Sequence, residues 1–280
     1  MEAFLIMKTL TTRAASALVA VISIVLLIVY YGDLGLKFLC YMAAILGIRE
    51  LIRIVFLPTD SIYGKFIFSA LAALVFVMGA QFPEHSTLGF AVISLVFCSL
   101  SILFVGHFQD LSALFHFQAK SVLGFFYVGL LPALAYRIVL LPSGNLWFLT
   151  MLGIVFAGDT FAYVFGMLWG KRKILPQVSP KKTLIGSLGG LLGSMLAGAV
   201  SAGFFLTSVP IWMMVVLALV TGVLAQLGDL FESMMKRIAN RKDSGSIMPG
   251  HGGVLDRLDG VLFGAPIVLA GALLIEKILH

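Results

Sequence analysis

Nine apolar runs, each about 20 residues long and joined by short connections, constrain the fold of this chain most strongly. The runs cover residues 13–31, 34–56, 64–82, 86–106, 120–141, 146–170, 183–206, 210–232 and 255–279. The chain is 60% hydrophobic and only 11% charged, whereas soluble proteins carry about 25% charged residues. We therefore predict an all-α integral membrane protein with about nine transmembrane helices, folded as a single polytopic domain over residues 1–280.

The distribution of positive charge predicts the orientation of these helices. Of the 19 Lys and Arg residues, only Lys37, Arg137 and Lys277 fall on the side that is reached after an odd number of spans. Because positive residues accumulate on the cytoplasmic side, we place the N-terminus and the loops at 171–182 and 233–254 in the cytoplasm. This bias also accounts for the net charge of +6, so nucleic-acid binding is not predicted.

Small residues recur every four positions in the sixth and seventh spans. The first series is Gly158, Ala162, Gly166 and Gly170, and the second pairs Gly186 with Gly190 and Gly189 with Gly193. Small residues at this spacing let two helices approach closely in lipid. We favour helix packing over the alternative, in which these glycines make space for a substrate.

Acidic residues inside apolar spans are the first candidates for function, because a buried carboxylate in a membrane usually has a partner or a role. Asp159 lies eleven residues before Gly170, roughly 16 Å from the predicted cytoplasmic end of its helix. Asp229, Glu232 and Ser233 share one helix face, and Asp256 and Asp259 share another. Oxygen ligands without clustered His or Cys favour Mg²⁺, with Mn²⁺ as the alternative. Together, these acids therefore favour a divalent cation.

Simpler explanations exist for several of these acids. Acids in the first turn of a helix complement its dipole, which accounts for one of Asp256 and Asp259. For Asp229, the alternative to metal binding is a salt bridge to Lys236 or Arg257. Two other acids are interpreted without function: Glu50 as a helix-surface pair with Arg53, and Asp110 as a solvated loop residue.

The segment from Ser233 to Gly260 also supplies groups that suit phosphate. Its cationic candidates are Lys236, Arg237, Lys242 and Arg257. Gly252 and Gly253 allow close approach of the backbone, and N–H groups at a helix start can bind an anion. His251 either contacts phosphate or caps the following helix. For the basic loop at 171–182, attraction to anionic lipid headgroups is the usual explanation.

The order of these residues resembles the signature of the phosphatidate cytidylyltransferases, also called CDP-diacylglycerol synthases. The resemblance covers Ser233 to Asp259, the preceding Gln226–Leu230 with Glu232, the segment Gly158–Tyr163, and Ser179–Thr183. Two positions depart from the family pattern. Met248 replaces another apolar residue, and Ile185 stands where a Glu is expected before Gly186.

The resemblance implies transfer of a cytidylyl group from CTP to phosphatidic acid, giving CDP-diacylglycerol and pyrophosphate, with the catalytic motifs in 155–260. It implies catalytic roles for Asp229, Asp256, Asp259, Lys236 and Arg237. The implied metal ligands are Asp229, Asp256 and Asp259. The implied substrate-binding residues are Asp159, Ser179, Lys181, Lys182, Thr183, Ser233, Lys242, His251, Gly252, Gly253 and Arg257. The expected site faces the cytoplasm in a bacterial inner membrane, among membrane lipids, and a homodimer is left open.

Two alternatives to this function are kept. Ile185 leaves room for a CTP-dependent enzyme that acts on another lipid phosphate or on an isoprenoid alcohol. Buried acids are also typical of ion-coupled transporters. A transporter would not need the spacing of polar residues from Ser233 to Asp259, so the transferase is the preferred hypothesis.

Overall fold

The computed structural model describes residues 26–56, 60–245, 247 and 252–279, and within these ranges the chain is helical and forms no β-strand. The α-helices are α2 (Asp33–Val55), α3 (Ile62–Gln81), α4 (Ser86–Ile102), α5 (Leu111–Gly124), α6 (Leu131–Val139), α7 (Gly144–Trp169), α8 (Leu184–Phe204), α9 (Ile211–Ile238) and α10 (Leu255–Leu279). Short 3₁₀ turns precede α4 and follow it, at Pro83–His85 and Val105–His107. A π-helical segment, Phe125–Leu130, joins α5 to α6.

Seven stretches of the described residues are long and apolar enough to cross a membrane. They are residues 62–81, 83–102, 111–139, 144–169, 184–204, 211–238 and 255–279. The prediction of an all-helical membrane protein is therefore confirmed, whereas the count of nine spans and the orientation of the N-terminus stay predictions. Most of the first predicted span, 13–31, lies outside the described residues. The second corresponds to α2, which has the length of a span but is interrupted by charged residues.

Two helix boundaries differ from those predicted. Helix α9 continues to Ile238 instead of ending at 232, so that Ser233, Lys236 and Arg237 lie on a helix and not in a loop. The extension is possible because Lys236 is buried against two carboxylates. The fifth span begins earlier, at Leu111, because the Asp110 carboxylate accepts a hydrogen bond of 2.6 Å from the Ala113 N–H. Asp110 is thus a helix cap rather than a simple solvated loop residue.

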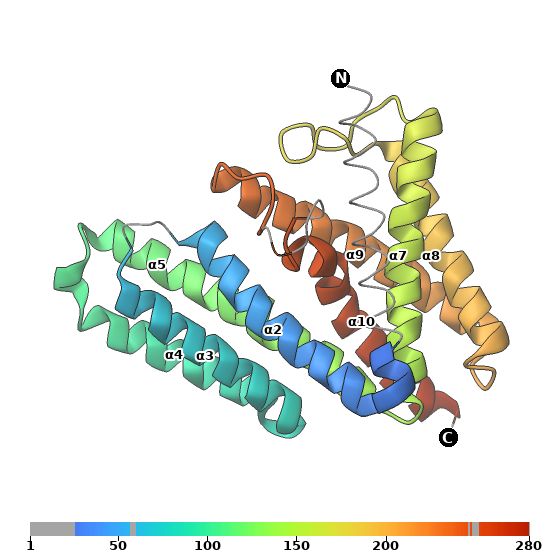
Figure 1. Ribbon diagram of the computed structural model, residues 1–280, viewed down its shortest axis with the longest axis horizontal. Helices are drawn as coiled ribbons and strands as arrows, with labels where there is room; N and C mark the ends of the chain where they lie inside the picture. The colour runs from blue at the N-terminus through green and yellow to red at the C-terminus, as the bar shows by residue number, and fades with distance from the viewer. Residues whose placement is uncertain (1–25, 57–59, 246, 248–251, 280) are drawn as a thin grey trace.

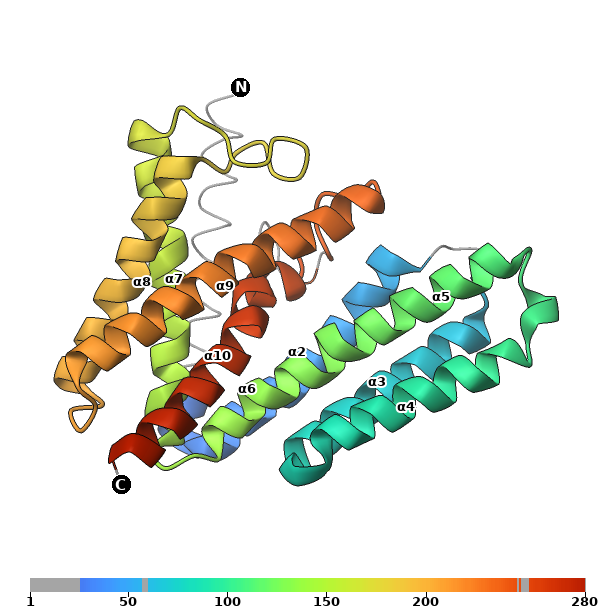
Figure 2. The same cartoon turned by 180° about the vertical axis from the view of Figure 1, so that it is seen from behind.

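Helix α10 lies between two groups of helices (Figures 1 and 2). On one side α7 packs along α8, and α9 packs against both α8 and α10. On the other side α10 contacts α6 and α2, beyond which lie α3 and α4. Buried apolar residues such as Met151 of α7, Ile138 of α6 and Ala265 of α10 form the core between these groups. The arrangement brings the start of α10 close to helices from both halves of the chain.

The small residues of α7 and α8 form the contact between these two helices. A methyl group at Gly193 would lie 2.7 Å from the Ala157 carbonyl oxygen, and one at Gly190 would lie 2.9 Å from the Gly158 carbonyl oxygen. At Gly186 it would lie 2.8 Å from the Ala162 carbonyl oxygen. These distances are shorter than side chains tolerate, so the prediction that the glycines serve helix packing is confirmed.

Candidate active site

An ion pair joins the loop between α7 and α8 to helix α9. Lys182 Nζ lies 2.6 Å from a carboxylate oxygen of Asp229, and both side chains are partly exposed. Ser233, one turn further along α9, donates a hydrogen bond of 3.3 Å to the other oxygen of Asp229. The alternative that paired Asp229 with Lys236 or Arg257 is therefore replaced by a pair with Lys182, a residue predicted to bind substrate.

Asp159 brings the motif on α7 to the same place. Its side chain is exposed although it lies well inside the helix. The charges that act on its carboxylate include those of Asp229, Lys182 and Arg257. Residues from α7, the following loop, α9 and α10 are thus close enough to one another to interact electrostatically.

A second ion-paired group lies one turn further along α9, around Lys236. This residue is 7% exposed, and its ammonium group pairs with Asp256 of α10 and lies 3.4 Å from Oε1 of Glu232. Glu232 is fully buried. Because a lysine is rarely buried without partners, the two carboxylates explain why α9 continues as a helix to this point.

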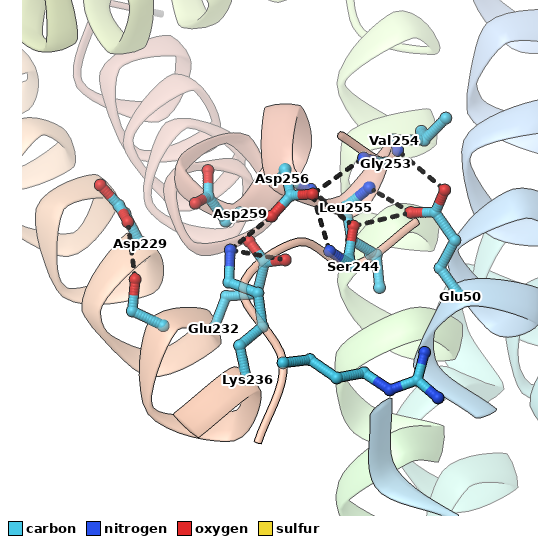
Figure 3. A network of polar contacts seen from close by, with 12 residues as sticks. Glu50, Asp229, Glu232, Lys236, Ser244, Gly253, Val254, Leu255, Asp256 and Asp259 are labelled. Carbon is cyan, nitrogen blue, oxygen red and sulfur yellow. Dashed lines mark hydrogen bonds and ion pairs between the residues drawn. The ribbon is translucent and has the colours of Figure 1, made fainter. Parts of the chain in front are cut away.

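Asp256 also holds the loop that precedes α10 (Figure 3). Its Oδ2 accepts hydrogen bonds from the Ser244 N–H, the Ser244 hydroxyl and the Gly253 N–H, each 2.8 Å long. Its Oδ1 accepts from Lys236. Both oxygens of this predicted metal ligand therefore have protein donors in the structure.

Glu50 of α2 is part of the same network, and its interpretation as a surface pair with Arg53 is wrong. Its side chain is 0% exposed and reaches from α2 to the start of α10 (Figure 3). It accepts hydrogen bonds from the N–H groups of Val254 (3.0 Å) and Leu255 (2.9 Å) and from the Ser244 hydroxyl (3.0 Å). Backbone and hydroxyl donors thus satisfy this buried carboxylate, whereas Arg53 is exposed.

Glu232 is the carboxylate in this region that is least satisfied. Neither of its buried oxygens accepts a hydrogen bond from the described residues, and the buried hydroxyl of Tyr127 also has no partner there. Asp259 is buried nearby, where the charges of Asp229 and Glu232 act on it, and its Oδ1 accepts from the Gly260 N–H at 2.7 Å. Among the described residues, no three His, Cys, Asp or Glu side chains form a ready-made metal site. Asp229 and Asp256 are turned toward lysines instead.

The remaining predicted site residues take different positions. Thr183 is 3% exposed and caps α8, since its hydroxyl accepts from the Gly186 N–H at 3.1 Å. Arg237 donates to the Val178 carbonyl oxygen at 3.2 Å and so holds the 171–183 loop against α9. Lys181, Lys242 and Arg257 are exposed, and Ser179 is half-buried. His251 and the departure at Met248 lie outside the described residues.

The glycine turn before α10 is shaped by the carboxylates around it. Gly252 has a φ of +82°, a conformation that favours glycine, and a methyl group there would lie 2.5 Å from Asp256 Oδ2. Gly253 is buried, and a methyl group there would overlap the Ser244 hydroxyl and the Glu50 carboxylate. The absence of side chains at these glycines therefore lets the Asp256 and Glu50 carboxylates approach the backbone. This role differs from the predicted contact with phosphate.

No site role is predicted from the sequence for Glu50 or Tyr127, and Glu232 is predicted only to share a helix face with Asp229 and Ser233. The signal for Glu50 was the one that singled out Asp159, namely an acid within an apolar span. Because Arg53 is a possible partner one turn away on the same helix, no distant partner for Glu50 was predicted.

Comparison with known proteins agrees with the geometry. A model of the "Cytidylyltransferase family" matches residues 11–274. The phosphatidate cytidylyltransferase of Staphylococcus haemolyticus (strain JCSC1435) is 32% identical over 266 residues, which cover 94% of this chain and 97% of that protein. The phosphatidate cytidylyltransferase of Staphylococcus epidermidis (strain ATCC 12228 / FDA PCI 1200) is 33% identical over 260 residues, or 91% of this chain and 96% of that protein. The chain therefore belongs to the cytidylyltransferase family.

Proposed function

We propose that this membrane protein transfers the cytidylyl group of CTP to phosphatidic acid and releases pyrophosphate, the activity named for its relatives. The observation that carries the proposal is the pair of lysine–carboxylate contacts, Lys182 with Asp229 and Lys236 with Asp256. They bring together the segments that resemble the family signature. They also place cations and carboxylates side by side where α9 and α10 meet.

The proposed reaction brings two polyanions together. An oxygen of the lipid phosphate forms a bond to the α-phosphorus of CTP while the bond from that phosphorus to the bridging oxygen breaks, and pyrophosphate leaves. The attacking phosphate is already ionised, so the main task of the protein is to position the reactants and neutralise their charge. Lys236, Arg237, Lys242 and Arg257 are the proposed phosphate-binding cations, with Lys182 and Lys181 on the facing loop.

The proposed cofactor is Mg²⁺, or Mn²⁺, held by Asp229, Asp256 and Asp259. Glu232 is fully buried beside Lys236 and close to Asp259, so it would add a further carboxylate next to these ligands. When bound, the ion would neutralise phosphate charge and polarise the α-phosphorus. Lys182 and Lys236 contact two of the proposed ligands, so the same lysines are suited to turn toward the phosphates of a bound nucleotide.

The proposed setting follows from the distribution of charge. We place the protein in a bacterial inner membrane, with nine spans, a cytoplasmic N-terminus and the site facing the cytoplasm, where CTP is available. The diacylglycerol tails stay in the bilayer, and only the headgroup enters the site. The oligomeric state stays open, and chemical crosslinking in isolated membranes tests for a homodimer.

One assay tests the function directly. Purified protein is mixed with radiolabelled CTP and phosphatidic acid in detergent micelles, with Mg²⁺ or with EDTA. We expect labelled CDP-diacylglycerol with Mg²⁺ and none with EDTA, and activity restored by excess Mg²⁺. Parallel reactions replace phosphatidic acid by an isoprenoid alcohol or another lipid phosphate. Turnover of a replacement lipid without turnover of phosphatidic acid would overturn the proposed substrate. Cation flux into liposomes without pyrophosphate release would support a transporter.

The metal assignment is tested by Asp259→Asn. The amide keeps the shape of the side chain but removes the charge, so we expect turnover to fall at least about 100-fold. The variant should insert and purify normally. Asp33→Asn, at the first turn of α2 away from the site, is the matched control. Full activity of Asp259→Asn at limiting Mg²⁺ would remove this residue from the metal site.

A further inference from the structure

We propose that Glu50 is a positioning residue for the reaction. It binds both the loop that carries Ser244 and the start of α10, and so holds the Asp256 carboxylate against the Lys236 ammonium group. The proposal rests on the function proposed above. It extends the site to α2, a helix outside the segments that resemble the family signature.

The Glu50 carboxylate is enclosed on several sides by loop and helix backbone. Oε1 accepts from the Val254 N–H, and Oε2 accepts from the Leu255 N–H. Gly245 and Gly253 lie so close that a methyl group on either would overlap the carboxylate. Gly47, one turn before Glu50 on α2, faces the Leu255 side chain. A methyl group at Gly47 would lie 3.3 Å from Leu255 Cδ2. The start of α10 is therefore fitted to α2 by shape as well as by hydrogen bonds.

Ser244 connects Glu50 to the proposed catalytic residues. Its hydroxyl lies 3.0 Å from Glu50 Oε2 and 2.8 Å from Asp256 Oδ2, but it has one hydrogen to donate. The two carboxylates therefore share a single donor. Asp256 in turn accepts from Lys236, so a chain of contacts runs from α2 through Ser244 and Asp256 to Lys236 on α9.

A cap for the dipole of α10 is the simplest alternative role for Glu50. Such a cap would require contacts with the first N–H groups of the helix alone. The contact with Ser244, eleven residues before Leu255, is not needed for capping. The enclosure by Gly245 also lies outside the helix. Glu50 thus fixes the loop relative to the helix, which is what holding Asp256 toward Lys236 requires.

The test compares Glu50→Gln with wild type in the full-length protein. Glutamine keeps the volume but has one acceptor oxygen, so its NH₂ group must face one of the donors that Glu50 satisfies. We expect kcat for cytidylyl transfer to fall about tenfold or more while the KM for CTP changes less than about threefold. Glu84→Gln, an exposed acid between α3 and α4, is the matched control.

Limited trypsin digestion reports on the loop independently of activity. Arg241 and Lys242 are exposed in the loop, and Lys171–Lys173 are exposed in the other basic loop of the same molecule. We expect Glu50→Gln to speed cleavage at 241–242 about tenfold without changing cleavage at 171–173. A helix cap that matters only for global stability would speed cleavage at both loops.

A double mutant separates positioning from general damage. If Glu50 acts through Ser244, then Glu50→Gln should lower kcat less in a Ser244→Ala background than in wild type. Additive effects, unchanged cleavage at 241–242, or a loosened loop with full kcat would each overturn the proposal. Absence of cytidylyl transfer by the wild-type protein would instead refute the proposed function, which keeps the two failures distinct.

Discussion

Two helix interfaces of this protein differ in the residues that form them: one consists of glycines and the other of charged side chains. Helices α7 and α8 meet through glycines, with backbone carbonyl groups in the space that side chains would fill. Where α9, α10 and their connecting loop meet, three carboxylates and one lysine are buried or nearly buried. The first interface brings two helices close without placing charge in the membrane. The second accepts the cost of buried charge, which indicates that its charges have a use beyond stability.

The difference also separates two kinds of carboxylate. Glu50 and Asp256 have donors for both oxygens, whereas both oxygens of Glu232 lack a hydrogen bond from the described residues. A satisfied carboxylate holds structure in place. Glu232 is held by the ion pair with Lys236, 3.4 Å from Oε1, and lies close to Asp256 and Asp259, so it joins the candidates for the site.

The largest effect is expected from Lys236→Met, which breaks the charged interface. Methionine fills similar volume, but Glu232 and Asp256 lose their shared cation. Breaking a buried ion pair costs about 3–5 kcal/mol, so we expect both a lower unfolding temperature in detergent and loss of cytidylyl transfer by at least about 100-fold. Lys171→Met removes an exposed lysine and should change neither. Wild-type kinetics in Lys236→Met would show that the buried pair is dispensable.

A smaller effect is expected from Lys182→Ala at the exposed edge of the site. Lys182 is partly exposed, and its pair with Asp229 is accordingly weaker than the buried pair. We expect the KM for CTP to rise about tenfold, with kcat reduced less, because a cation proposed to bind phosphate is lost. Initial rates measured over a range of CTP concentrations check this result. An unchanged rate at limiting CTP and lipid would exclude the residue from substrate binding.

The smallest effect on activity is expected from Gly193→Ala in the glycine interface. The added methyl group would lie 2.7 Å from the Ala157 carbonyl oxygen, so the helices must separate slightly, at a cost of about 1–3 kcal/mol. We expect a lower unfolding temperature but a kcat within about threefold of wild type. Gly153→Ala on α7, where nothing lies within 4 Å of the added group, should be neutral. A larger loss of kcat in Gly193→Ala than in Lys182→Ala would mean that the two interfaces are coupled.

Much of the fold was predictable because membrane helices follow local rules. Apolar run length gave the helices from 62 to 279 to within a few residues, apart from the end of α9 and the start of the fifth span. Those two errors have one cause. Asp110 and Lys236 were both predicted to lie in loops, although capping places Asp110 at the start of α5 and ion pairing keeps Lys236 within α9.

The sequence predicted which residues gather at the site, but not which of them contact one another. The residues that resemble the family signature do gather, yet Asp229 pairs with Lys182 from another motif, and Glu50 pairs with nothing near it in sequence. Spacing along one helix predicts which side chains share a face. It cannot predict which distant helix that face meets, because the contact is decided by packing over the whole chain.

The link from Glu50 to Val254 spans 204 positions of the chain, and this has a consequence for biogenesis. Helix α2 leaves the ribosome long before α10, so its acid must wait for its donors while six of the seven candidate spans are made. During that time an unmatched carboxylate sits in or near the bilayer. The positioning of Asp256 that we propose for Glu50 can therefore form only after α10 has been inserted, when its first N–H groups meet the waiting carboxylate.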